Sequence, residues 1–261
     1  MVPRAGDQVR AWGRLVTEGR ETWFEPPLAV PLIMIHPKPV RRPRSEAVPV
    51  TGGDFDAVAD RYELDGEVEG WATVTGTWTG HLLRVEQQTA GRPSVPDRSP
   101  KWQVPPCPPP PGGWPQGVPS GRRGWSGNLD FDPGDLQETG AAVTVVTFRP
   151  GDGQAVLVVA AADPAAVEAR LRPQLGSRLC VVPSRWTKSE LDAVRGHLHD
   201  RFWDWRLYSL RVDTLDDAQA RVRAQLTMVT PKIADWAASL PPGILTLDSW
   251  LLPVRAASQG T

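Results

Sequence analysis

Cysteine is scarce in this sequence: Cys107 and Cys180 are the only two in 261 residues. Small domains that rely on disulfides carry many more cysteines for their length, and zinc sites hold their cysteines in short, paired spacings. A chain this long can bury a large apolar core without such help. The sequence therefore argues against a disulfide scaffold and a cysteine-based zinc site, and we predict no metal and no cofactor.

Long apolar runs are also missing. The most apolar window, LAVPLIMI at residues 28–35, contains a proline and is far shorter than the roughly 20 residues of a membrane-spanning helix. We interpret it as a buried strand. The first residues, MVPRAGDQVRAWGRLV, lack the apolar run of an export signal. We therefore predict a cytoplasmic protein without a membrane partner.

Neither sign of charge is in clear excess: the sequence has 29 basic and 30 acidic residues, and its formal net charge is −1. No overall field draws the chain to nucleic acid or to an anionic membrane, so such a contact needs a local patch. One candidate patch is the proline-stiffened segment HPKPVRRPR at residues 36–44. Its basic residues, which we take as possible interaction residues, are Lys38, Arg41, Arg42 and Arg44. A solvated loop is the favoured interpretation of this segment.

Common catalytic and phosphate-binding motifs are absent from the sequence. It contains no G-x-x-x-x-G-K-[ST], no H-E-x-x-H and no C-x-x-C. We therefore predict no catalytic residues. Seven carboxylates between residues 54 and 69 could supply the pair that a glycosidase-like enzyme needs, although a run of this kind is usually a solvated face. A hydrolase with a site between two domains stays open as an alternative.

Residues 1–88 are expected to form a β-rich domain. In the stretch 71–78, small or apolar residues alternate with threonines, which is the period of a half-buried strand. The residues of one face are Ala72, Val74, Gly76 and Trp78. A Thr-Gly turn follows, and residues 81–87 return as the partner strand. A similar hairpin over residues 9–27 and a segment at 47–58 bring the total to about five strands, which predicts an OB-like or other small barrel.

Residues 139–261 alternate strands with helices. Asp163 followed by proline marks one helix N-terminus, and Thr187 opens a T-x-x-E capping box for another. Residue types in 218–229 favour a helix, but apolar and polar residues alternate strictly there, and the alternation predicts a strand. Residues 244–254 predict a final strand. The pattern indicates an α+β domain of ferredoxin-like character with helices on one face of its sheet.

Between these domains lies a segment rich in proline and glycine, residues 89–138, which we call the Pro/Gly/Trp strap. At about fifty residues it is too long for a simple connector in a compact protein. We expect part of it to pack on a domain surface with Trp114 as an anchor. The predicted fold class is thus α+β, with a β-rich half joined by the strap to a ferredoxin-like half.

The stretch VPPCPPPPGGW, with the hairpin VTGTWTGHLLRVEQ before it and LCVVPSRWTKSELDAVRGHL after it, resembles a group of uncharacterised actinobacterial proteins. They share a Cys-Pro-x-Pro-x-Gly-Gly-Trp segment between a β-rich half and an α/β half, and many are exported or lipid-anchored. The resemblance implies no activity. It implies that Cys107 and Cys180 approach each other, as a disulfide in exported members and as two buried thiols in a reducing cytoplasm. We therefore interpret Cys107, Trp114 and Cys180 as structural residues of the strap.

Three functions follow as hypotheses. A non-catalytic binding protein, whose partner is another protein or a small ligand, is favoured because folding features are abundant and catalytic motifs are absent. An OB-like binder of single-stranded nucleic acid is possible but not favoured, given the charge balance. The hydrolase with an interdomain site is the third.

Overall fold

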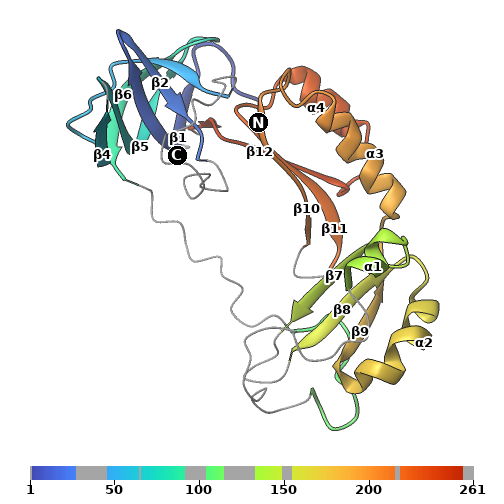
Figure 1. Cartoon of the computed structure of the whole chain (residues 1–261). Coiled ribbons are helices and arrows are strands. Elements are labelled where there is room, and N and C mark those ends of the chain that lie inside the picture. Colours follow the sequence, from blue (N-terminus) through green and yellow to red (C-terminus); the bar gives the residue numbers. More distant parts are fainter. Residues whose placement is uncertain are drawn as a thin grey trace, which may run out of the picture. The chain divides into compact units, whose positions relative to one another are not determined.

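The computed structural model describes residues 2–27, 46–64, 66–91, 104–114, 133–148, 155–214 and 218–254. They form a mixed α+β fold that is rich in strands and has several sheets (Figure 1). The chain divides into two compact units. Unit 1 consists of residues 1–96, 198–211 and 223–261, and unit 2 of residues 97–197 and 212–222. Both units are discontinuous in sequence, so the segment 139–261 contributes to each of them.

A closed ring of five strands forms the first part of unit 1. Its members are β1 Gln8–Glu18, β2 Glu21–Glu25, β3 Val48–Thr51, β5 Glu67–Trp78 and β6 Leu83–Ala90. The pairings run β1–β2, β2–β3, β3–β6, β6–β5 and β5–β1; the β3–β6 pairing is parallel and the others are antiparallel. Two further strands, β4 Ala59–Leu64 and β13 Leu252–Pro253, pair with β5 and β1. The β5–β1 pairing turns the sheet into a small barrel.

Alternating residues of these strands point into the barrel, as the period of two predicts. On β5, Ala72, Val74 and Trp78 are at most 3% exposed, which confirms the strand expected there. Neighbouring strands add the core residues Val9, Leu15, Phe24, Val48 and Leu83. The apolar face that the sequence placed on one side of each strand is therefore the barrel core.

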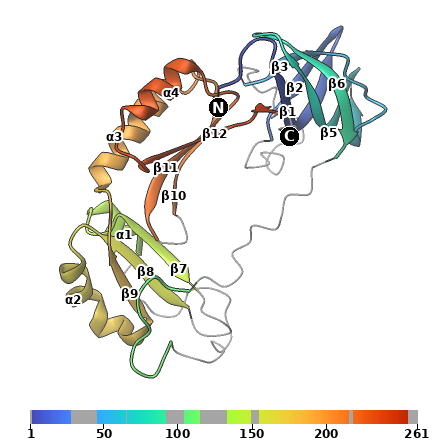
Figure 2. The ribbon, with the colours of Figure 1, turned by 180° about the vertical axis from the view of Figure 1, so that it is seen from behind.

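In unit 2, three strands form a second sheet, in the order β7 Thr144–Phe148, β8 Val156–Ala161 and β9 Leu179–Pro183. β7 runs antiparallel and β9 parallel to β8, and the crossover between β8 and β9 is helix α2 Pro164–Leu175 (Figures 1 and 2). The expected cap forms, because Ala166 N–H donates to Asp163 Oδ1 at 3.1 Å. The helix buries Val167, Leu171 and Leu175 against one face of this sheet.

The remaining elements are α1 Pro133–Glu138, the 3₁₀ turn η2 Gly176–Arg178, α3 Lys188–His199, β10 Leu207–Thr214, β11 Ala220–Leu226, α4 Pro231–Ala238 and β12 Leu245–Ser249. β10, β11 and β12 form a third sheet in that order. Along β11 every second residue is buried, so the choice of alternation over helix propensity is confirmed. The capping box also forms, since Glu190 N–H donates to Thr187 Oγ1 at 3.2 Å and Thr187 N–H donates to Glu190 Oε2 at 2.7 Å.

The single final strand expected over 244–254 is wrong. β12 belongs to the third sheet and β13 pairs with β1, so the chain changes sheets at Trp250 and Leu251, both buried. The Trp250 ring lies 4.8 Å from that of Phe24, and its Nε1–H donates to the carbonyl oxygen of Trp12 at 2.6 Å. Packing an indole into the barrel core outweighs continuing a straight strand.

A test of this packing uses Gly13 on β1, whose missing side chain leaves room for other groups. A Cβ at this position would fall on the carbonyl oxygen of Glu25 and 2.8 Å from Cζ2 of Trp250. We expect Gly13→Ala to lower the free energy of unfolding by about 1–3 kcal/mol, because a backbone oxygen and a buried ring cannot easily move aside.

The matched control is Gly196→Ala in α3, where nothing lies within 4 Å of the added Cβ. This change is expected to raise stability by up to about 1 kcal/mol, through helix propensity. Urea unfolding followed by tryptophan fluorescence measures both variants. A Gly13→Ala variant as stable as the unsubstituted chain would contradict the packing around Trp250.

Candidate functional site

Within the strap the structure describes residues 104–114, which we call the proline segment. A disulfide between Cys107 and Cys180 joins this segment to β9, with the two Cα atoms 5.7 Å apart. Of the two states that the sequence left open, a disulfide or two buried thiols, the structure has the disulfide. Cys107 and Trp114 pack against one face of the second sheet, on the cluster formed by Phe148, Val156, Val158, Cys180 and Ala218. The proline segment thus covers the sheet face opposite α2.

A groove of about 770 Å³ lies beside this segment within unit 2. One wall is made of Pro106, Cys107 and Pro108–Pro111 together with Trp114. The opposite side comes from the C-terminal part of α2, from Gly176 and Ser177, and from β9. The volume is in the range of small-molecule and peptide pockets, about 300–1,000 Å³.

The groove is electrically neutral. Among the described residues that line it, the charged ones are Glu168 and Arg172, which form an ion pair with Nη2 2.6 Å from Oε1. Arg172 Nη1 also donates to the carbonyl oxygens of Gly176 at 2.7 Å and Leu179 at 2.9 Å. Arg172 Nε also donates to Glu168 Oε1 at 3.2 Å, so four of the five N–H groups of the guanidinium are engaged and little capacity is left for an anionic ligand.

The floor of the groove is an edge strand. Ser184 N–H donates to the carbonyl oxygen of Ala161 on β8 at 2.8 Å. Because the backbone groups of successive residues in a parallel strand point to opposite sides, those of Leu179, Val181 and Pro183 point away from β8. The Pro183 carbonyl accepts from Gln219 Nε2 at 3.1 Å. The Val181 carbonyl lies 3.6 Å from Cys107 Sγ, but a disulfide sulfur has no hydrogen to donate. Side chains and the proline segment thus cover an edge that would otherwise invite another strand.

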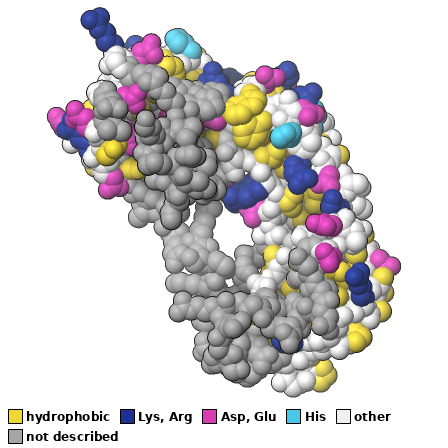
Figure 3. Space-filling model, in the orientation of Figure 1, with side chains coloured by type: hydrophobic (Ala, Val, Ile, Leu, Met, Phe, Trp, Pro, Cys, Tyr) yellow, Lys and Arg dark blue, Asp and Glu magenta, His cyan; other side chains and the backbone are white. Residues whose placement is uncertain are grey.

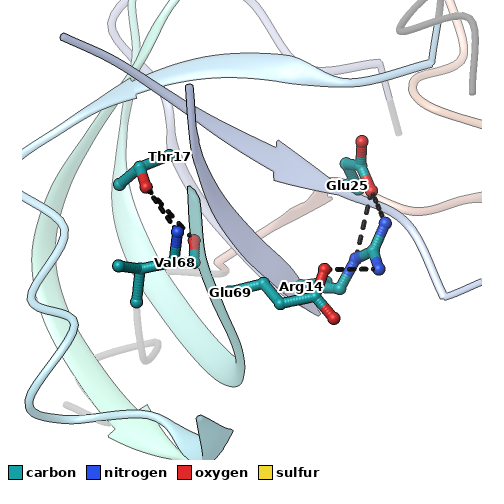
Figure 4. Close-up of polar contacts among 5 residues, drawn as sticks. All are labelled: Arg14, Thr17, Glu25, Val68 and Glu69. Atoms are coloured by element: carbon teal, nitrogen blue, oxygen red, sulfur yellow. Dashed lines mark hydrogen bonds and ion pairs between the residues drawn. The ribbon is translucent and has the colours of Figure 1, made fainter. Parts of the chain in front are cut away.

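A second candidate surface is the outside of the barrel, where Arg14 on β1 lies between two carboxylates (Figure 4). Arg14 Nη2 is 2.5 Å from Oε2 of Glu25 on β2, and Nη1 is 2.8 Å from Oε2 of Glu69 on β5. Beyond the last β1–β5 backbone pair, Thr17 Oγ1 accepts from Val68 N–H at 2.8 Å. These contacts fasten three adjacent strands to one another, and we interpret them as structural.

Aromatic rings lie on the same outer face. Trp12 and Trp71 stack with their ring centroids 5.2 Å apart and their planes 20° apart. Each ring gives one face to the other, so a nucleobase cannot insert between them without separating the pair. The stack is a cross-strand contact of the kind that stabilises sheets.

Three of the carboxylates that suggested a hydrolase form ion pairs with arginines. Glu69 binds Arg14, while Asp56 and Glu63 both pair with Arg61, at 3.2 and 3.7 Å. Across the described part of the chain, no group of three or more His, Cys, Asp or Glu side chains could hold a metal ion.

A half-buried titratable group, Tyr208 on β10, lies elsewhere in unit 1. Burial, and secondarily the nearby Asp248 carboxylate, raises the pKa of Tyr208 to about 12. Asp248 forms an ion pair with Arg223 on the same sheet. A phenol with this pKa is neutral at physiological pH and cannot act as a base there.

Comparisons with models of protein families, with curated proteins and with solved structures found no match to this chain. In the described ranges, no helix combines the length and the apolar character needed to cross a membrane.

The predicted site residues fare differently. Cys107, Trp114 and Cys180 are brought together in one cluster. The basic residues Lys38, Arg41, Arg42 and Arg44 lie outside the described residues. Sequence reasoning missed Glu168, Arg172 and Ser177, because a Glu and an Arg four residues apart on a helix normally indicate only a solvated ion pair.

The packing of Trp114 leads to a prediction about stability. Trp114→Ala removes a large apolar contact with the cluster under the proline segment. We expect the free energy of unfolding to fall by roughly 1–3 kcal/mol, less than for a fully buried tryptophan, because Trp114 is only half-buried. Thermal unfolding measures the change.

Val104→Ala is the control, since Val104 begins the same segment but is 73% exposed. Its effect should stay within about 0.5 kcal/mol. Equal melting temperatures for Trp114→Ala and the unsubstituted chain would show that Trp114 does not anchor the proline segment.

Proposed function

We propose that this chain is a non-catalytic binding protein that holds a neutral, apolar, extended segment of a partner protein in the groove between the proline segment and α2. The observation that carries the proposal is the groove itself, with one wall covalently attached to the sheet. Preformed concave sites with apolar walls and a few polar groups are typical of binding sites.

The chemistry of the lining selects the kind of ligand. Glu168 and Arg172 neutralise each other, so phosphate groups and strongly acidic peptides find no available cation. Leu179, Val181, Val182, the prolines and Trp114 offer apolar contacts. The open groove along the edge of β9 suits an extended chain, whose apolar side chains can contact the prolines, Trp114 and Val182.

The proposal is tested with a displayed library of random linear peptides, selected on the intact oxidised protein. We expect the selected peptides to be neutral and apolar. Ser177→Arg places a long side chain in the groove and should weaken their binding at least about tenfold in Kd, measured by fluorescence anisotropy.

Gln174→Arg serves as the control, because Gln174 is also exposed, lies three residues before Ser177, and does not line the groove. Its Kd should match that of the unsubstituted chain. Peptides that bind Ser177→Arg with unchanged affinity, or a library that yields no binder, would refute the groove as the binding site.

An OB-like barrel that binds single-stranded nucleic acid is the second candidate. The ring order β1-β2-β3-β6-β5, with its parallel β3–β6 pair, supports an OB-like assignment for unit 1. The ferredoxin-like character of the C-terminal half stays a prediction. Charge favours the peptide groove over nucleic acid: on the face in Figure 3, acidic and basic side chains are interspersed over the described residues, and the cation of the Arg14 cluster is already paired.

A labelled single-stranded oligonucleotide decides between these candidates. If the basic segment binds nucleic acid, the association should weaken steeply with salt, and replacing Arg41 and Arg42 by alanine should abolish it. We expect instead that the unsubstituted protein shows no salt-sensitive association. Strong binding that disappears in the double variant would establish the nucleic-acid function.

The cellular compartment of the protein affects whether the disulfide beside the groove persists. The cytoplasmic location expected from the sequence stays a prediction, and the disulfide favours a compartment in which such bonds persist.

A further inference from the structure

The groove and the disulfide share one residue. Cys107 lines the groove and is half-buried, whereas Cys180 is 1% exposed and lies in the apolar cluster beneath the proline segment. A reagent in the groove therefore reaches the sulfur of Cys107 before that of Cys180.

We infer that the groove is under redox control: a dithiol reductant that enters it cleaves the Cys107–Cys180 bond, releases the proline segment, and so removes one wall of the binding site. This inference rests on the proposed function for its consequence. Its structural part, the release of the segment, does not require a ligand.

The chemical step is a thiol–disulfide exchange. A thiolate of the reductant attacks Cys107 Sγ and forms a mixed disulfide, while the Cys107–Cys180 bond breaks and its electron pair leaves on Cys180 Sγ, which takes a proton. The second thiol of the reductant then attacks the reductant's first sulfur, which is bonded to Cys107 in the mixed disulfide. Cys107 leaves as a thiol, and the reductant closes its own disulfide.

Burial makes this step slow. The leaving sulfur, Cys180, is surrounded by apolar residues, which disfavour the thiolate that must form there. A ligand in the groove would slow the step further by covering Cys107. Reduction and ligand binding therefore oppose each other, and by linkage each weakens the other by the same factor.

The structural consequence comes from what holds the proline segment to the sheet. Among the described residues, the contacts of Cys107 and Trp114 join it to the cluster around Cys180. Once the covalent bond is cut, the segment is held by noncovalent contacts, namely those of the buried Pro105 and the half-buried Trp114. The outward backbone groups of Val181, beside which Cys107 lies, then become accessible to solvent.

The first experiment needs no ligand. Hydrogen exchange is compared in the full chain before and after dithiothreitol, followed by mass spectrometry of peptides covering residues 177–184 and α2. We expect the exchange of the Val181 amide, the β9 amide that points away from β8 next to Cys107, to rise at least about tenfold on reduction, while α2 changes little. Unchanged exchange of this amide would overturn the inference whatever the groove binds.

A control variant removes other effects of the reductant. Cys107 and Cys180 are the only cysteines in the sequence, so the double variant Cys107→Ser with Cys180→Ser contains no target for dithiothreitol. It should show the fast Val181 exchange of the reduced chain with or without dithiothreitol. Slow exchange in this variant would show that the disulfide does not hold the segment in place.

The direction of attack is tested with a monothiol. Glutathione at low excess should be trapped as a mixed disulfide on Cys107, identified by peptide mapping. An adduct found on Cys180 would contradict entry through the groove.

The second experiment separates the inference from the proposed function. A selected apolar peptide should bind the reduced protein at least about tenfold more weakly than the oxidised one, and a saturating amount should shift the equilibrium between dithiol and disulfide toward the disulfide by the same factor. If the oxidised protein binds no selected peptide, the proposed function fails, and hydrogen exchange alone decides the inference. If oxidised and reduced protein bind the peptide equally, the redox control fails and the binding function stands.

Discussion

The bond between Cys107 and Cys180 is the constraint on which the candidate site depends. It joins residues 73 positions apart and sets a proline-rich chain against the edge of a sheet. Closing a loop of that length in the unfolded chain is worth about 4 kcal/mol in the chain-entropy account. The prolines add to this, because their fixed backbone angle leaves less conformational freedom to lose. A segment without regular hydrogen bonding can therefore serve as a wall.

Unit 1 is held together by strand pairing and core packing. Its barrel closes when β5 pairs with β1, and Trp250 completes the core from far along the chain. On the outside, Arg14 forms ion pairs with Glu25 and Glu69, and the Trp12 ring stacks on the Trp71 ring. In both units the charged groups nearest the candidate surfaces are paired with one another. Recognition by shape and apolar contact is then more consistent with the structure than recognition by charge.

Local signals were reliable where the physics is local. The alternation in β5 and β11 identified buried faces, because successive side chains of a strand point to opposite sides whatever the tertiary fold. Asp163 and Thr187 marked helix starts because their side chains bond to amides of the same turn. The apolar run at 244–254 led to the wrong prediction of one continuous strand, because an apolar pattern indicates which residues are buried but not where the strand bends. The turn at Trp250 depends on a cavity built by strands more than two hundred residues earlier.

The sequence by itself determined the α+β class, the alternating faces of the strands, the helix caps and the importance of the segment around Cys107 and Trp114. Those features depend on neighbouring residues, or on composition, and need no partner elsewhere in the chain. Only the tertiary structure decided that the ring of strands closes, that Cys107 bonds to Cys180, and that Glu168 and Arg172 lie beside the prolines. Each of these brings together residues that are distant in sequence. Such contacts form when the free energy gained by burying apolar surface offsets the entropy lost in closing the loops between them. Both quantities depend on the whole chain, so no single stretch of sequence reveals them.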